Sequence, residues 1–257
     1  MKQNRVLIIG NSGIKHKSTD GQTIKVRLYI DALKKECVPF DFVDLEGGIK
    51  NIFKISRQIK KGIKKCDRII LLTASRGVKY FIPLINHFNK EHKVFILPMI
   101  GCNILNKYFK NVSIDEYFDY FNLKKEFKLK KKDRKQILKI DLILPENAAV
   151  ANLVKHYFPS SNIEILDNFR FVDCEYNEHF NNRKTLELVY LSRVWKEKGI
   201  FDLMEAIDVI SKTTNDITLD ILNSLKTTDF EEFMEYLKYR DEDGKEISVQ
   251  GRIADAL

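Results

Sequence analysis

Short apolar segments alternate with amphipathic segments along most of this 257-residue chain, and the alternation restricts the fold more than any other feature. Each apolar segment is rich in Val, Ile, Leu and Phe, which is typical of strands buried on both faces of a sheet. The predicted strands in the first part of the chain span 5–10, 40–45, 68–73, 93–98, 141–145 and 162–166. The predicted helices between them span 22–34, 49–64, 78–89 and 148–157. Strands that alternate with helices indicate an α/β fold with a parallel, doubly wound sheet and right-handed crossovers.

The alternation stops at 173–185, a polar stretch without periodicity that we interpret as a linker. A second α/β unit follows, with predicted strands at 186–191, 217–222 and 246–250 and predicted helices at 199–211 and 229–239. The sequence therefore predicts two Rossmann-like domains, residues 1–172 and 186–257. We expect the second domain to be incomplete, because a doubly wound domain normally has about five or six parallel strands.

Two cations are candidate ligand-binding residues in the turn between the first strand and the first helix of the second unit. Arg193 and Lys198 follow the strand at 186–191 and precede the helix at 199–211. Open α/β sheets bind ligands at the carboxyl ends of their strands, and cations beside a helix N-terminus suit a phosphate group. The turn therefore indicates a site for a phosphate-bearing ligand, with two solvated loop cations as the alternative.

The succession of a strand, Ser192-Arg193-Val194, a short spacer, Glu197-Lys198-Gly199 and a helix resembles a segment of known enzymes. It is similar to the donor-phosphate segment of retaining glycosyltransferases of the GT-B fold, in particular glycosyltransferase family 4 (glycosyl transferases group 1). The resemblance implies that Arg193 and Lys198 hold the diphosphate of a UDP or GDP sugar, without a metal or another cofactor. It further implies transfer of the sugar, with retention, to a saccharide or lipid-linked acceptor in cell-surface polysaccharide or glycolipid synthesis.

The catalytic residues stay unassigned in this reading. The family's pair of glutamates, separated by seven residues, would lie beyond Leu257. We therefore expect either a fragment of a longer enzyme or a shortened protein. The alternative function is that of a non-catalytic relative that binds acceptor, membrane or a partner chain.

The loop after the first strand contains glycines, and Gly10 and Gly13 would allow a sharp exit from that strand. The resemblance assigns this loop to the acceptor side of the enzyme and Asn168 to the turn that enters the second domain. The loop residues concerned are Gly13, Thr19, Asp20, Gly21 and Gln22.

A nicotinamide-dependent dehydrogenase is the alternative for the same loop. Asp44 and Glu46 follow the second strand, where NAD-binding domains place an acid on the ribose. However, the stretch from Gly10 to Gly13 departs from the G-x-G-x-x-G spacing, and the loop that continues to Gly21 is too long for the tight turn. These departures disfavour the dehydrogenase.

The net charge of +8 favours anionic partners, which include phosphorylated ligands and anionic lipid headgroups. The run 124–135 interleaves Phe127 and Leu129 with cations, so an amphipathic helix there could lie on an anionic membrane. A solvated surface helix is the alternative. We expect no nucleic-acid partner, because the sequence contains no recognition motif for one.

Metal ligands and targeting segments are not indicated. The histidines lack metal-ligand spacing, and the four cysteines are too scattered for a zinc site or a disulfide framework. The sequence contains neither an apolar span of about 20 residues nor a signal-peptide pattern. We therefore expect a cytoplasmic protein, with peripheral contact at the inner face of the membrane.

Overall fold

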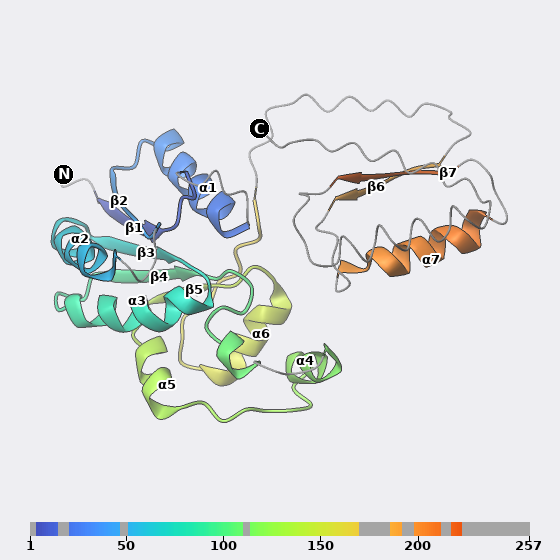
Figure 1. Ribbon diagram of the computed structural model, residues 1–257. Coiled ribbons are helices and arrows are strands. Elements are labelled where there is room, and N and C mark those ends of the chain that lie inside the picture. Colours follow the sequence, from blue (N-terminus) through green and yellow to red (C-terminus); the bar gives the residue numbers. More distant parts are fainter. Residues whose placement is uncertain are drawn as a thin grey trace. The chain divides into compact units, whose positions relative to one another are not determined.

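The computed structural model of the chain describes residues 4–14, 21–46, 51–109, 114–169, 186–191, 198–211 and 217–222. The chain divides into two compact units, Met1–Asp173 and Cys174–Leu257. Each unit contains a parallel sheet with helices packed on it (Figure 1). The predicted linker, helix 229–239 and strand 246–250 lie outside the described residues.

The sheet of the first unit has five parallel strands in the order β2-β1-β3-β4-β5. Their bounds are β1 (Val6–Gly10), β2 (Phe40–Asp44), β3 (Arg68–Leu72), β4 (Val94–Pro98) and β5 (Leu142–Leu144). Each end lies within one residue of its predicted position. The predicted doubly wound parallel sheet is confirmed.

The predicted strand at 162–166 is wrong. The segment runs parallel to β5 but pairs with it through a single bridge, between Ile163 and Ile143. Ile165, which a paired strand would also use, is 50% exposed. Because β5 has only three residues, it offers little length for a further strand.

Helices cover both faces of this sheet, with α1 on one side and α2 and α3 on the other (Figure 1). The helices of the unit are α1 (Gly21–Lys35), α2 (Ile52–Lys65), α3 (Ser75–Phe88), α4 (Ile114–Phe121), α5 (Lys131–Ile137) and α6 (Ala148–Tyr157), with a short 3₁₀ helix η2 (Asn106–Tyr108). Strand β1 contributes side chains to the cores on both faces of the sheet, because alternate side chains of a strand point in opposite directions. Val6 and Ile8 join the α1 side, and Leu7 and Ile9 join the core under α2 and α3.

Helix α1 packs closely on β1. Its buried apolar residue is Val26, whereas Ile24 and Leu28 are only partly buried. A Cβ atom on Gly10 would lie 2.7 Å from Val26 Cγ2. Gly10 is therefore required because the helix approaches the strand so closely, in addition to any role in the exit from β1.

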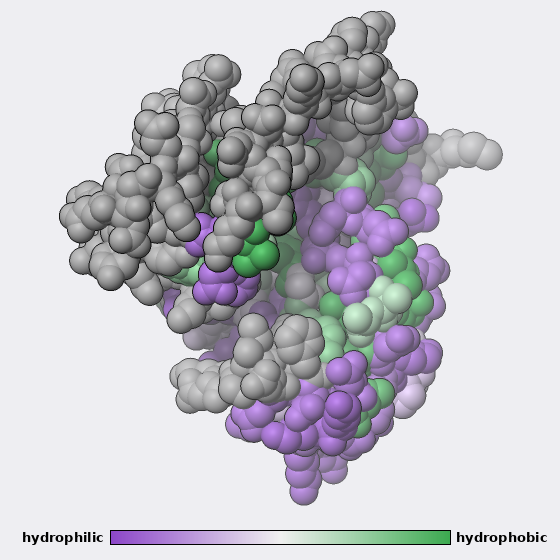
Figure 2. All heavy atoms as spheres, turned by 90° about the vertical axis from the view of Figure 1, so that its right-hand side faces the viewer, coloured by the Kyte–Doolittle hydropathy of each residue, from purple (hydrophilic) through white to green (hydrophobic). Residues whose placement is uncertain are grey.

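The basic run 124–135 is not one amphipathic helix. Only its last part is helical, in α5, and Phe127 and Leu129 pack against the core. Phe127 stacks on Tyr157 and Tyr108, with ring centroids 4.1 and 4.7 Å apart. The apolar side chains that a membrane contact would need thus pack against the core. Figure 2 shows the lower part of the face turned to the viewer as largely hydrophilic.

The described part of the second unit consists of two parallel strands, β6 (Leu186–Leu191) and β7 (Ile217–Leu222), and the helix α7 (Ile200–Ser211). Its core is formed by Tyr190, Ile200, Met204, Ile207 and Leu219. Ile210, near the end of α7, is 39% exposed. Among the described residues of both units, no helix has the length and apolarity needed to cross a membrane.

Candidate functional site

The strand order of the first unit creates a switch point between β1 and β3. The chain leaves β1 towards β2 on one side, whereas β3 leads to β4 on the other, and ligands of open α/β sheets bind at such a point. The first turn of α1 meets the start of α3 here, since Gln22 Oε1 accepts a hydrogen bond from the backbone N–H of Ala74 at 3.2 Å. Gln22, one of the predicted loop residues, therefore lies at the switch point.

The exit from β1 is held by short-range hydrogen bonds. Gly13 has a φ of 62°, which favours glycine, and its N–H donates to Asn11 Oδ1 at 3.0 Å. The buried hydroxyl of Ser12 donates to Asp44 Oδ2 at 2.6 Å, and Asp44 Oδ1 accepts from the N–H of Glu46 at 2.9 Å. Both oxygens of Asp44 thus support the loop, which further disfavours the ribose-binding role of the dehydrogenase alternative.

A buried lysine gathers three segments at the same edge of the sheet. Lys25, which is 7% exposed, projects from α1 and donates through Nζ to Glu146 Oε1 at 2.7 Å and to the carbonyl oxygen of Met99 at 2.8 Å. Its third partner is Asn168 Oδ1 at 3.3 Å. An ammonium group has three hydrogens, so Lys25 is fully bonded and acts as an anchor. We call this arrangement the Lys25 anchor.

The Lys25 anchor holds the residues that follow β4 and β5. Glu146 lies directly after β5, and its second oxygen accepts from the N–H of Gly101, in the turn after β4, at 3.2 Å. Asn168, which we predicted for the interdomain turn, is exposed and bonds to the lysine side chain. Our sequence reasoning missed Lys25 and Glu146. No local signal marks the pair, because the lysine and the acid that it meets are 121 positions apart in the sequence.

Tyr29 lies beside this anchor. Burial raises the pKa of its hydroxyl, and the negative charge of Glu146 adds to the increase. Its ring contacts Phe169 with centroids 5.7 Å apart, and its hydroxyl has no hydrogen-bond partner among the described residues. The phenol therefore stays protonated and presents a buried O–H next to the Lys25 anchor.

The start of α3 comes unusually close to the end of β3. A Cβ atom on Gly77 would lie 1.8 Å from Thr73 Oγ1, so only glycine fits. Buried Asn103 donates through Nδ2 to the carbonyl oxygen of Thr73 at 2.8 Å, which fixes the strand end. Among the described residues, no side chain caps α3 at Ala74.

In the second unit, Lys198 lies at the end of the turn between β6 and α7. Its side chain is exposed, and its carbonyl oxygen accepts from the hydroxyl of Tyr190 on β6 at 3.3 Å. Gly199 follows with a φ of 71°, and its carbonyl oxygen accepts from the N–H of Leu203 in the first turn of α7. This turn therefore presents the lysine next to the N-terminus of α7, a position that suits a phosphate group.

The remaining predicted residues are placed only in part. Gly21 is exposed at the first position of α1, whereas Thr19, Asp20 and Arg193 lie outside the described residues. Convergence of Arg193 and Lys198 on one diphosphate therefore stays a prediction. Within the described part of the chain, no three His, Cys, Asp or Glu side chains gather in a way that could hold a metal ion.

Solved structures place this fold among the GT-B glycosyltransferases. Anabaena Alr3699/HepE in complex with UDP and glucose aligns with 98% of this chain and 70% of its own, with a TM-score of 0.57 and 12% identity. A structure of the same protein in complex with UDP aligns with a TM-score of 0.58 and 9% identity, over 98% of this chain and 70% of its own. The lipopolysaccharide outer core galactosyltransferase WaaB, in its apo form, aligns with 97% of this chain and 68% of its own, with a TM-score of 0.55 and 13% identity.

These likenesses confirm the predicted GT-B type of fold. At such low identity they show the fold alone, so membership in family 4 and retention stay predictions. No protein-family model matches the sequence, and no curated protein matches it.

Proposed function

We propose that this protein is a glycosyltransferase that moves a sugar from a nucleoside diphosphate sugar to a hydroxyl group. The observation that carries the proposal is the exposed Lys198 on the turn between β6 and α7, in a chain of the GT-B fold. The description of HepE in complex with UDP and glucose, and that of WaaB as a galactosyltransferase, support a UDP sugar as the donor.

The chemistry of the reaction explains why cations are needed at this turn. When the bond between sugar and diphosphate breaks, negative charge grows on the departing diphosphate. Lys198, Arg193 and the amides of the first turn of α7 would stabilise that charge, and no metal ion would be required. We further propose the retaining mechanism of family 4, on the resemblance of residues 192–199 to its donor-phosphate segment.

The acceptor would bind at the switch point of the first unit. The acceptor site would be lined by the predicted loop residues Gly13, Thr19, Asp20, Gly21 and Gln22. The Lys25 anchor, which includes Asn168, would support the site from below. We propose a saccharide or lipid-linked acceptor of cell-surface polysaccharide or glycolipid synthesis. Catalysis would then take place in the cytoplasm, at the inner face of the membrane. The free thiols of Cys37 and Cys66 support a reducing compartment.

Calorimetric titration with UDP, UDP-glucose and GDP tests the donor site. Removal of one charge-assisted hydrogen bond costs about 1.5–3 kcal/mol, so Lys198→Ala and Arg193→Ala should each weaken UDP binding by roughly 10- to 150-fold. Lys139→Ala, which removes an exposed cation from the first unit, is the control and should leave the affinity unchanged. The proposal fails if both site variants bind UDP as tightly as the unaltered protein.

A further inference from the structure

The outward face of α2 carries an unusual concentration of positive charge. Six of its 14 residues are Lys or Arg and none is acidic. All six are exposed: Lys54, Arg57, Lys60, Lys61, Lys64 and Lys65. The opposite side of the helix buries Ile55, Ile59 and Ile63 in the core. At about 100° per residue, the six cations spread over the outward half of the helix. We call this surface the α2 basic face.

The charge of the α2 basic face is not neutralised by its surroundings. None of the six cations forms an ion pair with any residue that the structure describes, and Lys60 instead lies over the ring of Phe88, 5.9 Å from its centroid. The run 124–135 differs, because acids interrupt it and Lys125 pairs with Glu116 at 2.9 Å. The α2 basic face is therefore the stronger attractor for a polyanionic surface.

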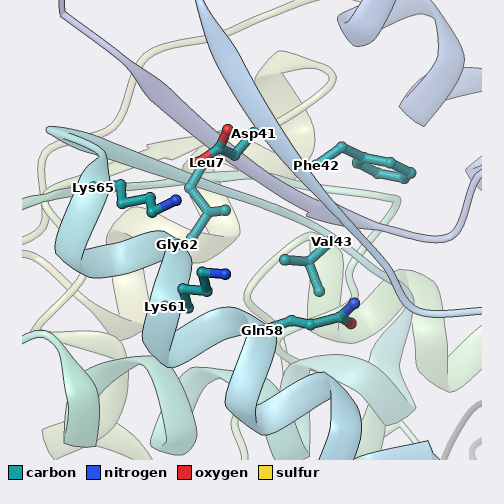
Figure 3. Close-up of a pocket in the computed structure, with 8 residues that line it drawn as sticks. All are labelled: Leu7, Asp41, Phe42, Val43, Gln58, Lys61, Gly62 and Lys65. Carbon is teal, nitrogen blue, oxygen red and sulfur yellow. The ribbon is translucent and has the colours of Figure 1, made fainter.

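Hollows lined by lysines flank the helix on both sides. One, of about 310 Å³, lies between α2 and the edge strand β2, and Figure 3 shows Lys61 and Lys65 reaching into it from α2. Asp41 on its opposite side is already paired with Arg5 at 2.8 Å. The other, of about 300 Å³, lies between the ends of α2 and α3 and is lined by Lys60, Lys64, His87, Phe88, Lys90, Glu91 and Ile63. Both hollows are large enough to receive a phosphate headgroup with its hydration water.

An exposed aromatic side chain accompanies these cations. Phe53 is 83% exposed, and the helical period places it on the side of α2 that carries Lys60 and Lys64. A phenyl ring in water gains free energy when it enters the boundary between headgroups and acyl chains, where amphipathic helices place such residues. This apolar anchor favours a lipid surface over a nucleic acid, since no second exposed aromatic residue on α2 would continue a stacking platform.

We infer that the α2 basic face binds an anionic lipid bilayer, with phosphate headgroups in its two flanking hollows and Phe53 inserted at the headgroup level. The inference extends the lipid-linked acceptor of the proposed function, because it places the surface through which the enzyme would reach such an acceptor. It replaces the run 124–135 as the membrane-binding segment, since Phe127 and Leu129 are used in the core.

Vesicle co-sedimentation of the full chain tests this inference. Vesicles of phosphatidylglycerol and phosphatidylcholine should bind the protein, and vesicles of phosphatidylcholine alone should not. The variant Lys60→Gln/Lys61→Gln/Lys64→Gln/Lys65→Gln should bind the anionic vesicles roughly 600-fold more weakly, because each of the four basic residues near an anionic membrane contributes about fivefold. The matched control is Lys124→Gln/Lys128→Gln/Lys131→Gln/Lys132→Gln, which lowers the net charge equally in the run 124–135 and should lose less than fivefold.

The depth of Phe53 is measured separately. Phe53→Trp in a chain whose Trp195 is replaced by Phe should show a blue-shifted emission on anionic vesicles and none on phosphatidylcholine. Equal losses in the two quadruple variants, or no emission shift, would overturn the inference. It is also overturned if an oligonucleotide competes fully with vesicles for the α2 basic face at lower concentration. Calorimetric titration with UDP separates the proposals, because failure of UDP binding counts against the proposed function and leaves the vesicle result unaffected.

Discussion

Lys25 Nζ and Glu146 Oε1 lie 2.7 Å apart although 121 positions separate the two residues in the sequence. The pair connects α1 to the end of β5, and through Gly101 and Met99 it also holds the turn after β4. It is largely withdrawn from water, with side-chain exposures of 8% and 18%. The edge of the sheet where an acceptor would bind is thus held together by one ionic contact.

Removal of one partner of this pair should be costly. Lys25→Met leaves the carboxylate of Glu146 without its counter-charge, and breaking a buried pair in this way lowers the free energy of unfolding by about 3–5 kcal/mol. Urea denaturation followed by far-UV circular dichroism measures the change. The double variant Lys25→Met/Glu146→Leu should lose less than the sum of the single changes. Lys125→Met, which removes an exposed and solvent-screened pair, is the control and should cost far less than Lys25→Met.

Gly77→Ala should destabilise the first unit by about 1–3 kcal/mol, because the new methyl group would overlap the Thr73 side chain and displace α3. Thermal unfolding measures the effect. Thr73→Ala in the same chain removes the nearest oxygen and one methyl group but keeps Cβ, so it should restore part of the loss. Gly21→Ala is the matched control, since its new methyl group would meet nothing within 4 Å. Equal effects at positions 77 and 21 would contradict the close approach of α3 to β3.

Two phenylalanines should differ sharply in their effect on stability. Phe127→Ala removes the ring stacked between Tyr157 and Tyr108, and we expect a loss of about 3 kcal/mol in the free energy of unfolding. Phe53→Ala, at an exposed position, should change it by less than about 0.5 kcal/mol. Chemical denaturation measures both. A large loss at position 53 would show that its ring has a structural role, and would weaken its assignment to the membrane.

The cysteines should react in an order set by burial. Cys37 is exposed, whereas burial, followed by the nearby charge of Asp41, raises the pKa of the Cys66 thiol to about 11. In a Cys174→Ser background, alkylation with iodoacetamide and mass spectrometry should therefore detect Cys37 first at pH 8. Because the folded state favours the protonated thiol, the stability that Cys66 contributes is present below pH 9 and is lost as the pH rises from about 9 to 11. Cys66→Ala should remove that alkaline component from the pH dependence of unfolding.

The sheet could be predicted closely from the sequence because each strand is a short apolar run between polar turns, and parallel strands buried on both faces give this pattern. The segment 162–166 has the same apolar character but lies beyond the short β5, where it forms one bridge. The segment does not form a strand because β5 is short, and the local sequence of 162–166 does not encode the length of its neighbour. Phe127 was similarly misplaced, because its lysine neighbours indicate a surface whereas its four aromatic contacts lie elsewhere in the chain.

Only part of the candidate site could be predicted. Lys198 and Gly199 were accessible to reasoning because cation, glycine and helix start are adjacent in the sequence. The buried position of Lys25 could not be predicted, because a lysine in a helix normally faces water and the acid that stabilises it is distant in the sequence. The requirement for glycine at position 77 likewise arises from the position of Thr73 in space.

Helix α2 separates its buried isoleucines from its exposed cations, and this separation has an evolutionary consequence. Its isoleucines are committed to the interior, while its six cations touch little else in the described fold, so the two sets can change independently. Neutral substitutions at those six positions would reduce the net charge of the chain from +8 to +2 without disturbing a single interior residue. A lineage could therefore tune the proposed adhesion to acidic surfaces through one solvent-facing helix, while the proposed acceptor site stays under separate selection.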